Sequence, residues 1–239
     1  MSHRFYVPPE CFSDGEINFT TEQRNQIKNV LRLKPGSHVT VFDGSGRAFA
    51  TIIDSAEHGT VQEISTPNVE SKLHLTLVQS LPKGDKIELS LQKCTEIGVS
   101  EFIIAETSRT IPKIDAKKLP GRLHRWRSIV TEAAEQSGRV RVPKVSGILP
   151  FKEALKLTSD RTLRIMPWEC EPDRLFSTML RKMEAAETMV IFIGPEGGFS
   201  DEEAAAAQES GATTVSLGPR ILRTETAAIV ASTLALHSI

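Results

Sequence analysis

Residues 189–228, MVIFIGPEGGFSDEEAAAAQESGATTVSLGPRILRTETAA, are the stretch that decides the fold. Residues 189–193 form a short apolar run with the length and β-branched content of a buried strand. Residues 194–199 then hold three glycines and a proline, which indicates tight turns and close approach of the backbone. Ser200 and Glu203 follow with the spacing of a capping box and predict the start of a helix.

The second half of this stretch repeats the order of strand, loop and helix. Gly211 predicts the end of the first helix, and residues 213–217 predict a second strand. Residues 218–223 form a second tight loop, after which Thr224 is predicted to cap a final apolar helix. Ligands of parallel α/β sheets bind outside the carboxyl ends of the strands, so we expect the two loops to form one site.

The two loops exclude the common phosphate-binding motifs. No lysine follows the glycines as in G-x-x-x-x-G-K-[ST], and the G-x-G-x-x-G spacing is absent. Glu196 within the first loop would repel phosphates. A ligand without phosphates, held through backbone groups, fits better. The alternative is a pair of ordinary turns that need glycine for geometry alone; Arg220 and Arg223 in the second loop favour a functional interpretation.

GPEGGFS followed by SLGPRILRTETA resembles the SPOUT class of methyltransferases. It is most similar to the family that methylates N3 of a uridine in 16S ribosomal RNA of the small subunit. Further similar segments are VLRLKPGSHVTVFDGSGRAF (30–49), QKCTEIGV (92–99), TSRT (107–110) and EAAEQSGR (132–139). The resemblance spans nearly the whole chain. It implies an α/β protein with an N-terminal PUA-like β-barrel and a C-terminal SPOUT domain, which has a parallel sheet and a deep trefoil knot.

Composition sets further bounds. With 239 residues, 39% hydrophobic and 25% charged, the chain suits one large or two modest globular domains. The net charge of −1 gives no global signal for nucleic acid. Cys11, Cys94 and Cys170 are odd in number and widely spaced, so we expect no metal site, no disulfide framework and a cytoplasmic location. The N-terminus lacks the apolar core of a signal peptide and no run approaches membrane-spanning length, so no membrane association is expected.

Two domains are predicted, residues 1–70 and 71–239. The first is β-rich, with strands at 3–7, 39–42, 48–53 and 59–64, a hairpin turn at 43–46 and a helix at 18–33. By resemblance it is an RNA-binding barrel; the alternative is a barrel that only packs on its neighbour. From residue 73, strands at 73–81, 101–105 and 162–166 alternate with helices at 85–97, 118–137 and 173–187. Such alternation predicts a parallel sheet with helices on both faces.

The strongest local charge bias lies in residues 109–144, where ten basic residues stand against Asp115, Glu132 and Glu135. A nearly neutral protein can still bind a polyanion through such a region, although a solvated helix face is the simpler explanation. The residues predicted to contact RNA are Arg4, Arg32, Lys34, Arg109, Arg122, Arg125, Arg139 and Arg141.

The resemblance implies that S-adenosylmethionine is the cofactor and that the protein is a homodimer acting on 16S rRNA of the small subunit. Its predicted cradle is Met166, Pro167, Ile193, Gly194, Pro195, Gly197, Gly198, Leu217, Gly218, Ile221, Leu222 and Thr226. We expect Arg223 to stabilise developing negative charge on the base, and Arg139 to lie at the active site or substrate entrance.

Glu225 or Glu196 is expected to remove the N3 proton, although either could equally be structural, Glu225 as a first-turn acid of the last helix. Because N3 of a paired uridine faces its partner base, a single-stranded or splayed uridine is the natural substrate. Two other functions stay open: a SPOUT methyltransferase acting on another RNA, and a non-catalytic RNA-binding factor in ribosome assembly. The sequence leaves open the exact uridine and whether the substrate is free rRNA or an assembled subunit.

Overall fold

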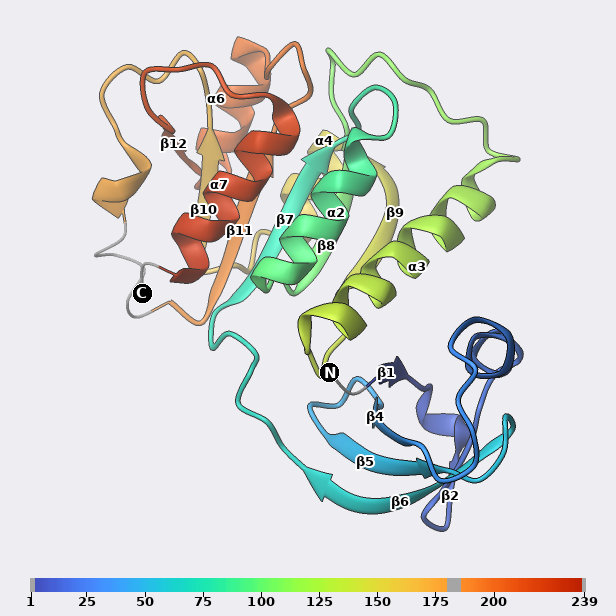
Figure 1. Ribbon diagram of the computed structural model, residues 1–239. Coiled ribbons are helices and arrows are strands. Elements are labelled where there is room, and N and C mark those ends of the chain that lie inside the picture. The colour runs from blue at the N-terminus through green and yellow to red at the C-terminus, as the bar shows by residue number, and fades with distance from the viewer. Residues whose placement is uncertain (1–2, 180–185, 238–239) are drawn as a thin grey trace. The chain divides into compact units, whose positions relative to one another are not determined.

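A computed structural model describes residues 3–179 and 186–237 (Figure 1). These residues form two compact units. The first comprises residues 1–70 together with 134–142, and the second comprises 71–133 together with 143–239. The first unit is therefore discontinuous in sequence, because a short segment far along the chain packs with the N-terminal residues.

The first unit is built on a curled six-stranded sheet in the order β1-β4-β5-β6-β3-β2 (Figure 1). Strands β1 and β4 are parallel and the other pairs are antiparallel. Phenylalanine, valine and isoleucine side chains from the strands and from the segments between them fill its core. The strands are β1 (His3–Tyr6), β2 (Phe12–Ser13), β3 (Glu16–Asn18), β4 (His38–Phe42), β5 (Ala48–Ile53) and β6 (His58–Ser65).

The helix predicted at residues 18–33 forms over a shorter range. Asn18 belongs to β3, and the Thr20 side chain caps helix α1 (Thr21–Asn25) through a capping box with Gln23. A π-helical segment (Gln26–Val30) continues it and buries Ile27. The prediction was wrong at both ends, because the apolar spacing that suggested it does not reveal where the cap lies.

The second unit contains a six-stranded sheet in the order β12-β10-β11-β7-β8-β9, in which every pair is parallel. This confirms the predicted parallel sheet. The strands are β7 (His74–Ser80), β8 (Glu101–Glu106), β9 (Lys144–Pro150), β10 (Leu163–Pro167), β11 (Thr188–Ile193) and β12 (Thr213–Val215). Because β10, β11 and β12 are neighbours and parallel, the loops after them emerge at one end of the sheet.

Helices cover both faces of this sheet. Helices α2 (Lys86–Ile97) and α7 (Thr224–His237) lie side by side over one face (Figure 1). Helices α4 (Phe151–Leu157) and α6 (Asp201–Glu209) share an apolar core with the side chains of the opposite face. Helix α3 (Leu119–Ser137) precedes β9 and buries Trp126 completely.

Three further differences from the sequence-based elements concern residues 144–187. Strand β9 and helix α4 were not predicted, because their sequence lacks a long apolar run. The helix predicted at 173–187 is wrong over its described residues: Leu175 forms a β-bridge with Ser216, and only a 3-10 turn (Phe176–Met179) follows. Residues 180–185 of that prediction lie outside the described residues. The trefoil knot stays a prediction.

Candidate functional site

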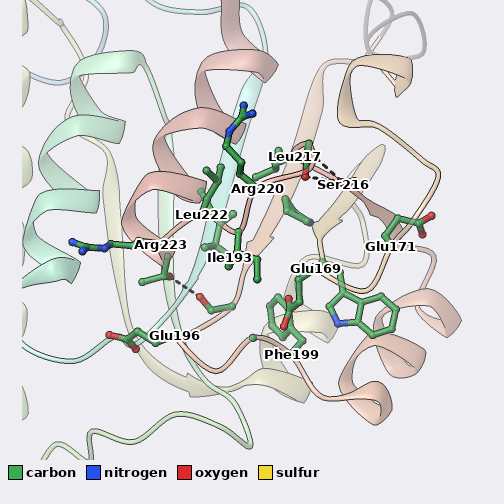
Figure 2. Close-up of a pocket in the computed structure, with 18 of the residues that line it drawn as sticks. Glu169, Glu171, Ile193, Glu196, Phe199, Ser216, Leu217, Arg220, Leu222 and Arg223 are labelled. Carbon is green, nitrogen blue, oxygen red and sulfur yellow. Dashed lines mark hydrogen bonds between the residues drawn. The ribbon is translucent and has the colours of Figure 1, made fainter.

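A pocket of about 590 Å³ lies at the carboxyl ends of β10, β11 and β12 (Figure 2). Its volume is within the range of about 300–1,000 Å³ that is usual for small-molecule sites. It is lined by Pro167, Trp168, Glu169, Glu171, Pro172, Ile193, Gly194, Pro195, Glu196, Gly197, Gly198, Phe199, Ser216, Leu217, Gly218, Pro219, Arg220, Ile221, Leu222, Arg223, Thr224 and Ala227. The two glycine-bearing loops therefore form one site, as the sequence predicts.

The first loop, residues 194–199, depends on its glycines. A Cβ on Gly194 would lie 3.2 Å from the Phe199 ring, and a Cβ on Gly198 would lie 1.8 Å from Oε1 of Glu169. Gly198 also has a φ of +68°, in the left-handed region that other residues rarely adopt. The loop ends at the predicted capping box, in which Ser200 and Glu203 begin α6.

The second loop, residues 216–223, begins earlier than predicted, because β12 ends at Val215, and the Thr224 side chain ties this loop to the first. Ser216 and Gly218 form a local turn, with the Gly218 amide donating to Oγ of Ser216 at 3.2 Å. Thr224 then donates from Oγ1 to the Gly194 carbonyl at 2.6 Å and accepts from Nε2 of Gln79 at 2.9 Å. Thr224 is the first residue of α7, so this hydroxyl connects the start of the last helix to the end of β11.

Two of the three acids in the pocket wall have fixed partners. Glu196 accepts from Nζ of Lys86 at 2.7 Å and from the Lys83 amide at 3.1 Å. Burial acts to raise the pKa of Glu196, but these donors outweigh it and hold the pKa below its ordinary value. A hydrogen bond from Thr214 is the main cause that lowers the pKa of Glu171. Glu169 forms no hydrogen bond or ion pair with the residues that the structure describes.

The charged side chains lie at several places around the pocket. In Figure 2 the side chains of Arg220 and Arg223 extend away from the part of the pocket where Glu169 and Phe199 lie. Both arginines are exposed, as is Ile221 between them, whose relative exposure is 91%. The site thus combines carboxylates with exposed basic and apolar side chains, and such a site can hold a cationic small molecule beside a polyanion.

The predicted cofactor residues all line this pocket except two. Met166 is fully buried in the apolar core shared with α4 and α6. Thr226 is exposed on the first turn of α7 and is not part of the pocket lining. The sequence analysis did not predict Trp168, Glu169 or Phe199 as pocket residues. They directly follow the predicted residues Pro167 and Gly198 in the sequence, and this proximity could have indicated them.

Of the four residues predicted to be catalytic, Arg223 and Glu196 line the pocket. Glu225 is 8% exposed in the first turn of α7, and its Oε2 has no hydrogen-bond partner among the described residues. Arg139 belongs to the first unit and is buried, where Nη2 binds Oε2 of Glu70 at 2.7 Å. The same carboxylate accepts the Val140 amide, so Arg139 is part of a closed local network.

The residues predicted to contact RNA fall into two groups. Several are occupied by the protein: Arg4 donates to the carbonyl of Arg139 and lies over the Phe42 ring, and Arg125 pairs with Glu88. Arg109 binds carbonyls of the first pocket loop. The other group comprises Arg32, Lys34, Arg122 and Arg141, which are exposed, as are Arg109 and Arg125.

In the described ranges, no cluster of three or more histidine, cysteine, aspartate or glutamate side chains is arranged to hold a metal ion. None of the helices in those ranges combines the length and apolar character needed to span a bilayer.

The chain matches two family models. Residues 69–236 match the RNA methyltransferase domain, and residues 19–63 match the RNA methyltransferase PUA domain. The first match alone covers more than half of the chain. Fold, site and family models together define a protein of the RNA methyltransferase class.

Similar proteins show to which family of RNA methyltransferases the chain belongs. The ribosomal RNA small subunit methyltransferase E of Synechocystis sp. is 36% identical over 97% of this chain and 76% of the relative. The protein of that name from Bacillus subtilis is 32% identical over 90% of this chain and 87% of the relative. The Neisseria gonorrhoeae enzyme, solved bound to S-adenosylmethionine, has a TM-score of 0.86 and 34% identity, covering 99% of this chain and 98% of that one. The chain belongs to the ribosomal RNA small subunit methyltransferase E family, which confirms the resemblance seen in the sequence.

Proposed function

We propose that the protein uses S-adenosylmethionine to methylate N3 of a uridine in 16S rRNA of the small ribosomal subunit. Membership of the family carries this proposal, together with a pocket built from the two glycine-bearing loops. S-adenosylmethionine supplies an electrophilic methyl group on a sulfonium centre. The chain's own residues must then hold the cofactor, orient the base, accept the N3 proton and stabilise charge on the base.

The pocket suits a ligand without phosphates. Gly194 and Gly198 let the Phe199 ring and the Glu169 carboxylate lie directly against the loop backbone, which places both groups in the pocket wall. Ile193, Leu217 and Leu222 supply apolar walls for an adenine ring, while Glu169 and Glu171 favour a cationic ligand over an anionic one. We propose that these residues hold the cofactor.

Arg223 and Glu196 are the proposed catalytic residues. Arg223 is exposed at the rim, where its guanidinium can stabilise negative charge on O2 or O4 of the uracil ring. Glu196 is the proposed proton acceptor because it is a carboxylate that lines the pocket, although its pairing with Lys86 lowers its pKa and makes it a weaker base. Glu225 is the alternative, supported by its unpaired Oε2 among the described residues.

No covalent adduct to the base is needed, because deprotonated N3 is itself the nucleophile. The environment of Cys94 agrees with this mechanism, since complete burial raises the pKa of its thiol to about 12. A thiol with that pKa is not ionised at neutral pH and does not act as a nucleophile.

The same proposal assigns roles to the rest of the chain. The N-terminal PUA-like domain, residues 1–70, contributes RNA contacts through exposed side chains such as Arg32 and Lys34, and residues 71–239 form the methyltransferase domain. Arg122 and Arg141 are proposed to bind phosphates. We also propose that the protein is a cytoplasmic homodimer whose C-terminal domain is knotted.

The decisive experiment is to incubate the purified protein with labelled S-adenosylmethionine and small subunits that lack the modification. Mass spectrometry of the nucleosides then identifies the product. We expect N3-methyluridine in 16S rRNA. Cofactor binding without this product would point to another RNA, and failure to bind the cofactor would leave a non-catalytic RNA-binding factor. Full turnover by Glu196→Gln and Glu225→Gln would remove both carboxylates from the role of proton acceptor.

A further inference from the structure

The segment that follows β8 begins with a tight turn at residues 107–110. The Thr110 amide donates to the Thr107 carbonyl at 3.1 Å, and the hydroxyls of Thr107 and Thr110 lie 2.9 Å apart in a hydrogen bond. Arg109 lies within this turn, so the hydrogen bonds of the turn hold its backbone independently of the contacts of its side chain. Residues 111–118 continue from it toward α3.

The Arg109 side chain is directed at the first pocket loop. Its Nη1 donates to the Gly197 carbonyl at 2.8 Å and to the Phe199 carbonyl at 3.2 Å. Its aliphatic stem lies against Gly197, where an added Cβ would be 3.3 Å from Cβ of Arg109. A guanidinium with these two acceptors fixes the path of the loop on both sides of Gly198.

A second contact holds the same turn to the start of α6. The Ser108 amide donates to Oε1 of Glu203 at 2.7 Å. The other oxygen of Glu203 accepts the Ser200 amide at 3.0 Å, which is half of the capping box. One carboxylate thus connects the 107–110 turn, the end of the glycine loop and the first turn of the helix.

These contacts lower the entropy cost of ordering the first loop around a ligand. A loop with three glycines in six residues loses much conformational entropy when it is ordered around a ligand. Carbonyls that are already bound by a side chain of the turn reduce this cost, and a preorganised loop binds its ligand more tightly.

We propose that Arg109 is a positioning residue of the cofactor pocket, which acts by holding the Gly197 and Phe199 carbonyls, and not a phosphate contact. This inference rests on the proposed function, since it takes the ligand of the pocket to be S-adenosylmethionine. It replaces the role in RNA binding that the basic character of residues 109–144 suggests.

Calorimetry with S-adenosylmethionine tests the proposal on the full-length protein and three variants. Arg109→Gln removes the charged donor, and Arg109→Lys keeps one. Arg127→Gln is the matched control, an exposed arginine without an ion pair among the described residues. We expect Arg109→Gln to weaken cofactor binding about tenfold, which corresponds to about 1.4 kcal/mol. Arg109→Lys should bind the cofactor with an intermediate affinity, and Arg127→Gln should bind it as tightly as the wild type. Thermal unfolding checks that each variant is folded.

RNA binding without cofactor distinguishes the two roles of Arg109. Gel-shift titration with a 16S rRNA fragment should give Arg109→Gln the same affinity as the wild-type protein. Unchanged cofactor binding, or a loss confined to RNA, would overturn the proposal.

Amide hydrogen exchange of the unliganded protein gives a readout that does not depend on the cofactor. If the wild-type protein itself fails to bind S-adenosylmethionine, the proposed function fails, but loop order can still be measured. Faster exchange at residues 196–200 in Arg109→Gln than in Arg127→Gln supports the positioning role. Equal exchange in the two variants refutes it.

Discussion

Substituting Gly198 by alanine should have two effects: backbone strain that lowers the melting temperature, and a change in the pocket that weakens cofactor binding. Gly198 has a φ of +68°, and a left-handed conformation costs an alanine about 1–2 kcal/mol. For a chain of this size, about 2–4 °C is lost per kcal/mol, so the melting temperature should fall by about 2–8 °C. The new Cβ would also lie 1.8 Å from Oε1 of Glu169, which must move.

The two effects have different consequences. Glu169 is exposed, so its carboxylate can rotate away at small cost to stability, but it then leaves its place in the pocket. We expect Gly198→Ala to lower the melting temperature and also to weaken binding of S-adenosylmethionine. The double variant Gly198→Ala/Glu169→Ala should keep the loss of stability, because the backbone strain is unchanged.

Gly211→Ala is the matched control. Gly211 also has a positive φ, +89°, but its added Cβ would have no atom within 4 Å, and it lies outside the pocket lining. It should show a similar fall in melting temperature, measured by calorimetry, with unchanged cofactor affinity. The reasoning is refuted if Gly198→Ala melts like the wild type, or if Gly211→Ala weakens cofactor binding as much.

Three further predictions concern charge, reactivity and packing. Because the folded pKa of Glu196 is lowered, its pairing with Lys86 stabilises the protein above the unfolded pKa of about 4.5, and this contribution disappears as pH falls through the folded value. This contribution to the free energy of unfolding should be at most about 1 kcal/mol in unfolding curves measured from pH 7 to pH 3. It should be absent in Glu196→Gln, and the same pH dependence in that variant as in the wild type would contradict the prediction. Exposed Cys170 should react with a thiol reagent at pH 8 while buried Cys94 reacts only on unfolding; rapid Cys94 labelling in the native protein would disprove its burial. Trp126→Ala should cost about 3–5 kcal/mol in denaturant unfolding because Trp126 is fully buried, and a loss below about 1 kcal/mol would show a loosely packed α3.

Local signals in the sequence succeeded where the physical cause is itself local. The capping box of Ser200 and Glu203 forms as predicted, because its hydrogen bonds join residues three apart. The strand at 189–193 and the glycine loop after it were likewise correct, since burial on both sides of a parallel strand requires a continuous apolar run. Alternation of strands and helices predicted the parallel sheet for the same reason.

Pairing between residues far apart in the sequence determined features that the sequence alone does not predict. The order β12-β10-β11 brings the residues after β10 to the pocket, so Trp168 and Glu169 become part of its wall although no motif marks them. Leu175 pairs with the distant residue Ser216 in a β-bridge, so the expected helix does not begin at residue 173.

The sequence by itself determined the family, the sheet type and the two loops of the site, because each is recorded in residue types at fixed spacing. Only the tertiary structure decided what the individual charges do. Arg139 is buried against Glu70, and Arg109 binds carbonyls of the pocket loop. An arginine in the sequence specifies a charge and a reach, whereas its partner is set by which backbone carbonyls and carboxylates the fold brings within hydrogen-bonding distance.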